Sequence, residues 1–244
     1  MANPPAPHEH YANHPIRVRP GATAAPAGVA PATLQVAYNF PTGITAGYGT
    51  TIAIVDAYND PSAESDLGVF STQFKLPTCT TANGCFTKVN QNGGTKYPRP
   101  DSGWALEISL DIQWAHAIAP GAKILLVEAA SNSFTNLMAA EDYASTHAQY
   151  VSNSWGSSEF SGESAYDTHF NRGGVSYFVS SGDNGAPAGY PSASPNVISV
   201  GGTTLHFDSS GALTSETGWS SSGADAAPTK PPTPPRQTSA NTPR

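Results

Sequence analysis

Short apolar runs alternate with longer amphipathic stretches through most of this chain. The runs predicted to be strands are 51–57, 86–90, 123–129, 150–155, 175–181 and 196–202. The stretches whose apolar residues follow a helical period are 61–75, 102–120, 133–148 and 163–173. Continuous apolar runs such as TIAIVDA and KILLVEA are typical of strands covered on both faces. The alternation therefore predicts an α/β fold with a doubly wound, mostly parallel sheet and helices on both faces. A hairpin is expected at 205–219.

Both ends of the chain lack this pattern. Residues 1–31 contain seven prolines and residues 226–244 contain six, and neither segment has the apolar spacing of a helix or strand. A segment that buries little apolar surface cannot offset the entropy lost on folding. We therefore expect a disordered arm at 1–31, an ordered domain at 32–225 and a disordered tail at 226–244. The histidines of the arm, from His8 to His14, are attributed to a disordered segment and not to a metal site.

Composition narrows the classes of partner. The net charge is −7 and no basic cluster occurs, which argues against nucleic acid. No apolar run approaches the roughly 18 residues that a membrane helix needs. Charged residues make up only 12% of the chain, with 23 glycines and 22 prolines. This balance is typical of a loop-rich secreted protein, although the first residues show no signal-peptide pattern.

Glu107 and Asp111 stand four residues apart in the stretch WALEISLDIQWAHAIAP (104–120). At about 100° per residue, both side chains lie on one face of a helix. The rest of this helix is largely apolar, so the two like charges repel and are costly to bury. Carboxylates with pKa values driven apart serve general acid–base catalysis. A solvated polar stripe on a half-buried helix is the alternative that this helix leaves open.

Two predicted strands end in small, polar loops. They are SNSWGSSE (152–159) and SSGDNG (180–185), where glycines flank Asp183. In open α/β sheets, ligands bind beyond the carboxyl ends of the strands. We interpret Ser152, Ser154, Trp155 and Gly156 as a peptide-binding edge, with small side chains that leave the backbone free to pair with an extended substrate. Trp155 either walls a side-chain pocket or belongs to the core, and Asp183 alone could be a turn residue.

Cys79 and Cys85 are the only cysteines, and they enclose the short polar sequence TTANG. The tight loop predicts a disulfide, with two free thiols as the alternative. A disulfide implies an oxidising compartment.

Several of these motifs, in this order, resemble the sedolisin family of serine-carboxyl peptidases, which has a subtilisin-like catalytic domain. They are AYNFP (37–41), IAIVDAYNDP (52–61), EISLD (107–111), APGAKILLVE (119–128), SNSWG (152–156), SSGDNG (180–185) and YPSASPNVISVGGTTL (190–205). The resemblance covers about residues 35–222. It implies a subtilisin-like fold, an extracellular location and a peptide or protein substrate bound by a monomer.

The resemblance also implies roles for three acidic residues. Glu107 matches the family's general base, Asp111 the aspartate that orients this base, and Asp183 the aspartate of the oxyanion hole. A carboxylate accepts a proton from a serine hydroxyl only where its pKa permits, and an aspartate donates to an oxyanion only when it is protonated. Proteolysis at acidic pH is therefore expected of such a site.

One part of the family pattern is missing. The family carries its nucleophilic serine in an S-G-T-S-x-x-x-P segment beyond all these motifs, whereas this sequence contains no Gly-Thr-Ser. We therefore expect a domain truncated at its C-terminus, with an incomplete sheet there, no nucleophile and no metal or cofactor, since the family's calcium site belongs to the same missing part. A subtilisin-type triad with Asp56 also lacks its Gly-Thr-Ser, and no G-x-S-x-G elbow occurs. Two functions remain: a serine-carboxyl endopeptidase that is inactive in this form, or an incompetent remnant that binds peptides.

Overall fold

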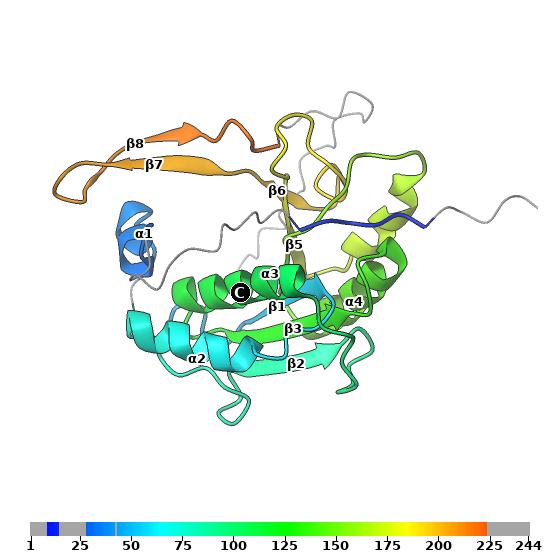
Figure 1. Ribbon diagram of the computed structural model, residues 1–244, viewed down its shortest axis with the longest axis horizontal. Coiled ribbons are helices and arrows are strands. Elements are labelled where there is room, and N and C mark those ends of the chain that lie inside the picture. The colour runs from blue at the N-terminus through cyan, green and yellow to red at the C-terminus, as the bar shows by residue number, and fades with distance from the viewer. Residues whose placement is uncertain (1–8, 15–27, 42, 224–244) are drawn as a thin grey trace, which may run out of the picture.

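The computed structural model describes residues 9–14, 28–41 and 43–223 (Figure 1). A six-stranded sheet forms its centre, in the order β2-β3-β1-β4-β5-β6. Its strands are β1 (Thr51–Ala57), β2 (Phe86–Asn90), β3 (Lys123–Ala129), β4 (Tyr150–Asn153), β5 (Ser176–Ser180) and β6 (Ile198–Val200). All neighbouring strands of this sheet are parallel, which confirms the predicted doubly wound α/β fold.

Helices cover both faces of the sheet. On one face, α2 (Ala63–Phe74) and α3 (Ser102–Ile118) lie side by side (Figure 1). Their apolar residues, such as Leu67 and Ile108, form a core with alternate residues of β1 and β3, such as Ile54 and Leu126. On the other face, α4 (Phe134–His147) packs on the intervening strand residues, with Val127 among them. Period-two alternation therefore divides each buried strand between two apolar cores.

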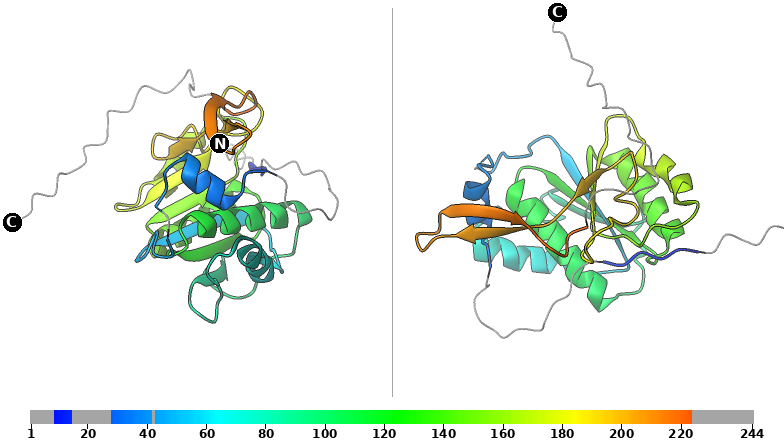
Figure 2. Two further views of the ribbon diagram at one scale, coloured as in Figure 1. Left: turned by 90° about the vertical axis from the view of Figure 1, so that its left-hand side faces the viewer. Right: turned by 90° about the horizontal axis from the view of Figure 1, so that it is seen from above.

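The remaining elements lie at the margins of this sandwich. Residues Glu163–Phe170 form a 3-10 helix, η1, which is shorter than the predicted helix. The hairpin of β7 (Thr203–Phe207) and β8 (Leu213–Gly218) extends away from the sheet (Figure 2). A short helix, α1 (Pro31–Ala37), lies close to it, and the Tyr38 hydroxyl donates to Glu216 Oε1 at 2.6 Å. The sequence pattern did not predict α1.

Residues 9–14 correct the expectation of a disordered arm over all of 1–31. Ala12 N–H donates to the Asn132 carbonyl at 2.8 Å, and Asn132 Nδ2 donates back to the Ala12 carbonyl at 2.7 Å. Ala12 is completely buried, and the His10 ring stacks on Phe160. We call residues 9–14 the N-terminal strap. Residues 1–8, 15–27 and 224–244, and with them the predicted tail at 226–244, lie outside the described residues.

Candidate active site

Helix α3 carries Glu107 and Asp111 toward the sheet. Asp101 caps the helix, because its Oδ1 accepts from Gly103 N–H at 3.0 Å and Trp104 N–H at 3.1 Å. Glu107 is 1% exposed, so it does not belong to a solvated stripe. Burial raises the pKa of Asp111 to about 7, although a hydrogen bond with Ser154 acts in the opposite direction. A protonated aspartate one helical turn from a buried glutamate suits proton transfer.

Asp56, at the end of β1, is a third carboxyl group of this cluster. Its side chain is completely buried. Burial raises its pKa well above the usual range, and the charges of Asp111, Glu107 and Glu128 raise it further. From the sequence, Asp56 was a candidate only for a subtilisin triad, and its position near Asp111 was not predicted. The available signal was an acidic residue at the penultimate position of the largely apolar strand TIAIVDA.

The acidic cluster continues along the sheet with Glu128, which forms an ion pair with Lys88. Parallel register places Glu128 of β3 directly opposite Asp56 of β1. Lys88 Nζ lies 3.0 Å from Glu128 Oε1, which also accepts from Asp60 N–H at 2.8 Å. Asp60 Oδ2 in turn accepts from the hydroxyl of Ser109 at 3.1 Å. In the sequence, Ser109 lies between the two acidic residues of α3. This network ties α3 to the carboxyl ends of β1, β2 and β3.

Asp183 lies in the loop after β5. Gly182 and Gly185 adopt φ values of +98° and +79°, which side chains rarely tolerate, so glycine is needed for this tight turn. Two backbone hydrogen bonds fix the loop. Gly185 N–H donates to the Ser221 carbonyl at 2.7 Å, and Gly223 N–H donates to the Gly182 carbonyl at 2.9 Å. Asp183 lines a pocket of about 450 Å³, whose walls also include residues 156–159 and 184–189.

The N-terminal strap lies along this pocket and reaches the carboxylates. Asn13 N–H donates to the Gly156 carbonyl at 2.8 Å, and Gly156 N–H donates to the Asn13 carbonyl at 3.1 Å, which is an antiparallel bridge. Asn13 and His14 both line the pocket that contains Asp183. The Nδ1 atom of His14 lies 3.7 Å from Glu107 Oε2. His14 thus links Glu107 to the pocket that contains Asp183.

The four residues expected to bind peptide take different positions. Ser152 pairs with strands on both sides, opposite Ile54 and Phe178, so its backbone is not available to a substrate. Ser154 forms a side-chain hydrogen bond with Asp111. Trp155 is completely buried and its Nε1 donates to the Val55 carbonyl at 2.9 Å, so it is a core residue, and it does not line the pocket that contains Asp183. Only Gly156 offers its backbone to an extended segment, here the strap.

Comparison with known proteins decides the family. The model of the subtilase family matches residues 79–233, which is more than half of the chain. The chain belongs to the subtilase family. This subtilase is 33% identical to kumamolisin of Bacillus sp. (strain MN-32) over 223 residues, covering 81% of its own length and 38% of kumamolisin. It is also similar to the structure of Pseudomonas sedolisin, a serine-carboxyl proteinase complexed with two molecules of pseudo-iodotyrostatin. That match has a TM-score of 0.65 and 26% identity, and it covers 80% of this chain and 59% of the other.

These matches confirm the sedolisin resemblance and a serine-carboxyl peptidase lineage for this subtilase. The chain spans about two fifths of kumamolisin's length. Among the described residues, no helix is both long and apolar enough to cross a membrane. In the same residues, one group of three metal-ligating side chains has its ligand atoms within 4.8 Å of one another: Cys79, Cys85 and His116. It lies outside the carboxylate cluster.

Proposed function

We propose that this subtilase provides the acidic half of a serine-carboxyl endopeptidase site that cleaves peptides at acidic pH. The observation that carries the proposal is the antiparallel bridge between Asn13 and Gly156 beside Glu107. The strap has the extended conformation that proteases impose on substrates, and pairing by β-strand addition positions a backbone without demanding a particular sequence. A peptide bound in the same way would present a carbonyl group near Glu107.

Each acidic residue has a separate task in this mechanism. When a serine hydroxyl attacks the peptide carbonyl, Glu107 accepts its proton and later donates it to the leaving amine. Asp111, with a pKa near 7, remains protonated in acid and donates a hydrogen bond that orients Glu107. Asp183 donates to the oxyanion from its glycine-flanked loop, and it can do so only when protonated. Water then hydrolyses the acyl-enzyme with Glu107 again as base.

The serine itself belongs to the Gly-Thr-Ser segment of the family, which these 244 residues do not contain. We therefore place the nucleophile in a polypeptide segment that completes the domain. A peptide or protein is the substrate, and we propose a monomer with an extracellular location, to which the Cys79–Cys85 disulfide is suited.

A second function is supported by the pairing of Gly156 with the strap, which needs no nucleophile. Without a serine nucleophile, the pocket and the Gly156 edge form a peptide-binding site with no covalent chemistry. In this case the carboxylates would be retained features of the ancestor, and binding would not depend on Glu107.

A chimaera distinguishes the two functions. Residues 28–223 would be joined to the C-terminal part of a sedolisin that carries Gly-Thr-Ser. We expect this chimaera to cleave denatured protein at about pH 4, and Glu107→Gln to lower kcat at least 10²-fold. Asp208→Asn, on the exposed hairpin turn, is the matched control and should leave kcat unchanged. A folded chimaera that binds peptide but does not cleave it would refute the peptidase proposal and favour the binding function.

A further inference from the structure

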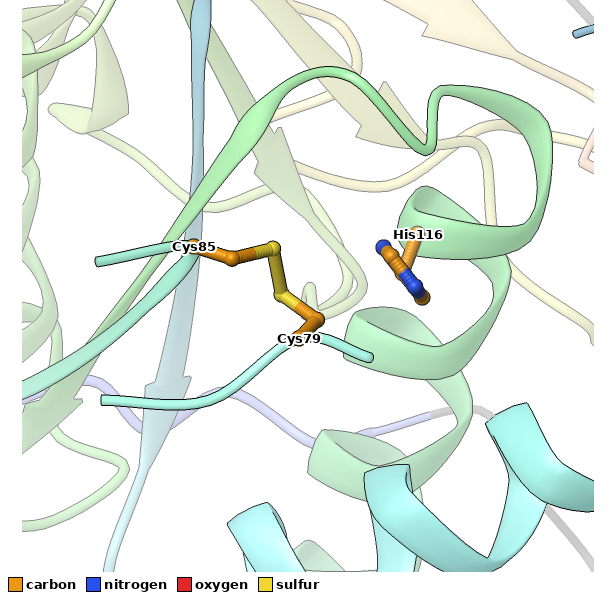
Figure 3. A group of neighbouring side chains, drawn as sticks. All are labelled: Cys79, Cys85 and His116. Carbon is orange, nitrogen blue, oxygen red and sulfur yellow. A yellow bond between two sulfur atoms is a disulfide. The ribbon is translucent and has the colours of Figure 1, made fainter. Parts of the chain in front are cut away.

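The disulfide between Cys79 and Cys85 lies against a buried histidine of α3 (Figure 3). Cys79 is 1% exposed and His116 is completely buried. The two sulfur atoms and one ring nitrogen of His116 all lie within 4.8 Å of one another. Two cysteines and a histidine are a common set of zinc ligands.

The Nδ1 atom of His116 is available as a metal ligand. Its Nε2 atom lies 2.8 Å from the Pro77 carbonyl, and because a carbonyl only accepts, Nε2 carries the proton. Nδ1 therefore has a free lone pair, and it is buried without a hydrogen-bond partner in the described part of the chain. Zinc-bound histidines typically donate their second ring N–H to a backbone carbonyl in this way.

The loop between the cysteines is held by bonds that do not depend on the disulfide. Asn83 Oδ1 accepts from Thr80 N–H at 3.1 Å and from Cys85 N–H at 3.0 Å. Asn83 Nδ2 donates to the Thr78 carbonyl at 2.8 Å. The Cα atoms of the two cysteines are 4.9 Å apart. Reduction therefore leaves both thiols close together and facing His116.

We propose that Cys79, Cys85 and His116 bind a zinc ion when the disulfide is reduced. A dithiol reductant supplies two electrons and two protons, becomes a disulfide itself and leaves two cysteine thiols. Zinc then displaces the two thiol protons, and a water molecule completes the tetrahedron. With Zn–S of about 2.3 Å and Zn–N of about 2.0 Å, the ligand atoms must be about 3.3–3.8 Å apart. Rotation of the two cysteine side chains separates the sulfurs by this amount.

The test uses the full chain and cobalt(II) as a coloured substitute for zinc. A phosphine reduces the disulfide, taking its oxygen from water, and is then removed. We expect the reduced chain to bind one cobalt ion with the intense thiolate charge-transfer absorption of a tetrahedral site, and zinc to displace it. The oxidised chain, which should contain no alkylatable thiol by mass spectrometry, should show no such band. A reduced chain that binds no more cobalt than the oxidised chain would overturn the proposal.

Two variants test the histidine. His116→Gln keeps an N–H that can reach Pro77 but removes the Nδ1 ligand, so cobalt affinity should fall at least tenfold. His147→Gln, on an exposed position of α4, is the matched control and should bind as the wild type does. Equal affinity of His116→Gln and wild type would exclude His116 from the site. Independently of either variant, zinc should raise the Tm of the reduced wild type and not that of the oxidised protein.

Discussion

The Nδ1 atom of His14 lies 3.7 Å from the Oε2 atom of Glu107, so the N-terminal strap ends beside the proposed general base. The strap reaches this position through the bridge between Asn13 and Gly156. Burial lowers the pKa of His14, while the charge of Asp101 acts against this shift. The same edge of the molecule thus serves both the chain's own strap and, in our proposal, a substrate.

Weakening the strap should make room for an added peptide. Asn13→Pro removes the N–H that donates to Gly156, whereas Asn13→Ala retains it. One hydrogen bond contributes about 1 kcal/mol, so we expect a synthetic peptide with the sequence of residues 9–14 to bind about fivefold more tightly to the proline variant. Titration with a fluorescent peptide measures the affinity. Equal affinities for both variants would mean that the added peptide binds elsewhere.

Stability should decrease as the pH rises from mildly acidic to alkaline values. Burial raises the pKa of Glu141 to about 8, and that of Glu128 to about 7, from the ordinary 4.5. The folded state therefore binds more protons than the unfolded state between these values, and stability present at low pH is lost as the pH rises through the folded pKa. We expect urea unfolding to give a free energy a few kcal/mol higher at about pH 5 than at about pH 8.

Glu141→Gln should reduce this pH dependence, because a neutral amide loses no proton. Asp208→Asn is the control, since hydrogen bonds within the hairpin turn lower the pKa of Asp208 and it stays ionised over this range. If the slope is the same in wild type and Glu141→Gln, then Glu141 is not the group responsible.

Trp155 should matter for stability and not for peptide binding. Trp155→Phe leaves the buried Val55 carbonyl without the indole donor, and we expect a loss of about 1–3 kcal/mol in the free energy of unfolding. Trp219→Phe, at a 39% exposed position, should change it by less than about 0.5 kcal/mol. Denaturant titrations and the peptide titration above give the two readouts. A large drop in peptide affinity in Trp155→Phe, with stability intact, would restore its role as a pocket wall.

A polypeptide of these 244 residues should not cleave denatured protein between about pH 3 and pH 7. Its acidic residues have no Gly-Thr-Ser to activate, and removing a nucleophilic serine costs about 10⁶ in turnover. Product analysis by mass spectrometry, with Glu107→Gln in parallel, provides the measurement. Cleavage that this substitution abolishes would contradict the prediction and point to another serine, such as Ser154, which bonds to Asp111, or Ser220.

Most of the fold and part of the site could be predicted because they depend on local periodicity. Strands buried on both faces require continuous apolar runs, so β1 and β3 were recognisable as TIAIVDA and KILLVEA. The spacing of Glu107 and Asp111 alone places them on one face of a helix. The family motifs made Asp183 a candidate, although its loop could otherwise have been a simple turn.

Tertiary structure alone decided which polar groups meet. Strand register set Asp56 beside Glu128, and the packing of α3 on β1 added Asp111 to the same cluster. The strap belongs to a proline-rich segment without an apolar period, so its docking could not be read from the local sequence. Its partners Asn132 and Gly156 come together only in the folded domain. The sequence by itself determined the strands of the central sheet, the helices that cover it and the helix carboxylates, since these follow from the period of the backbone. The strap and the third carboxylate depend on contacts between distant segments, which no local pattern encodes.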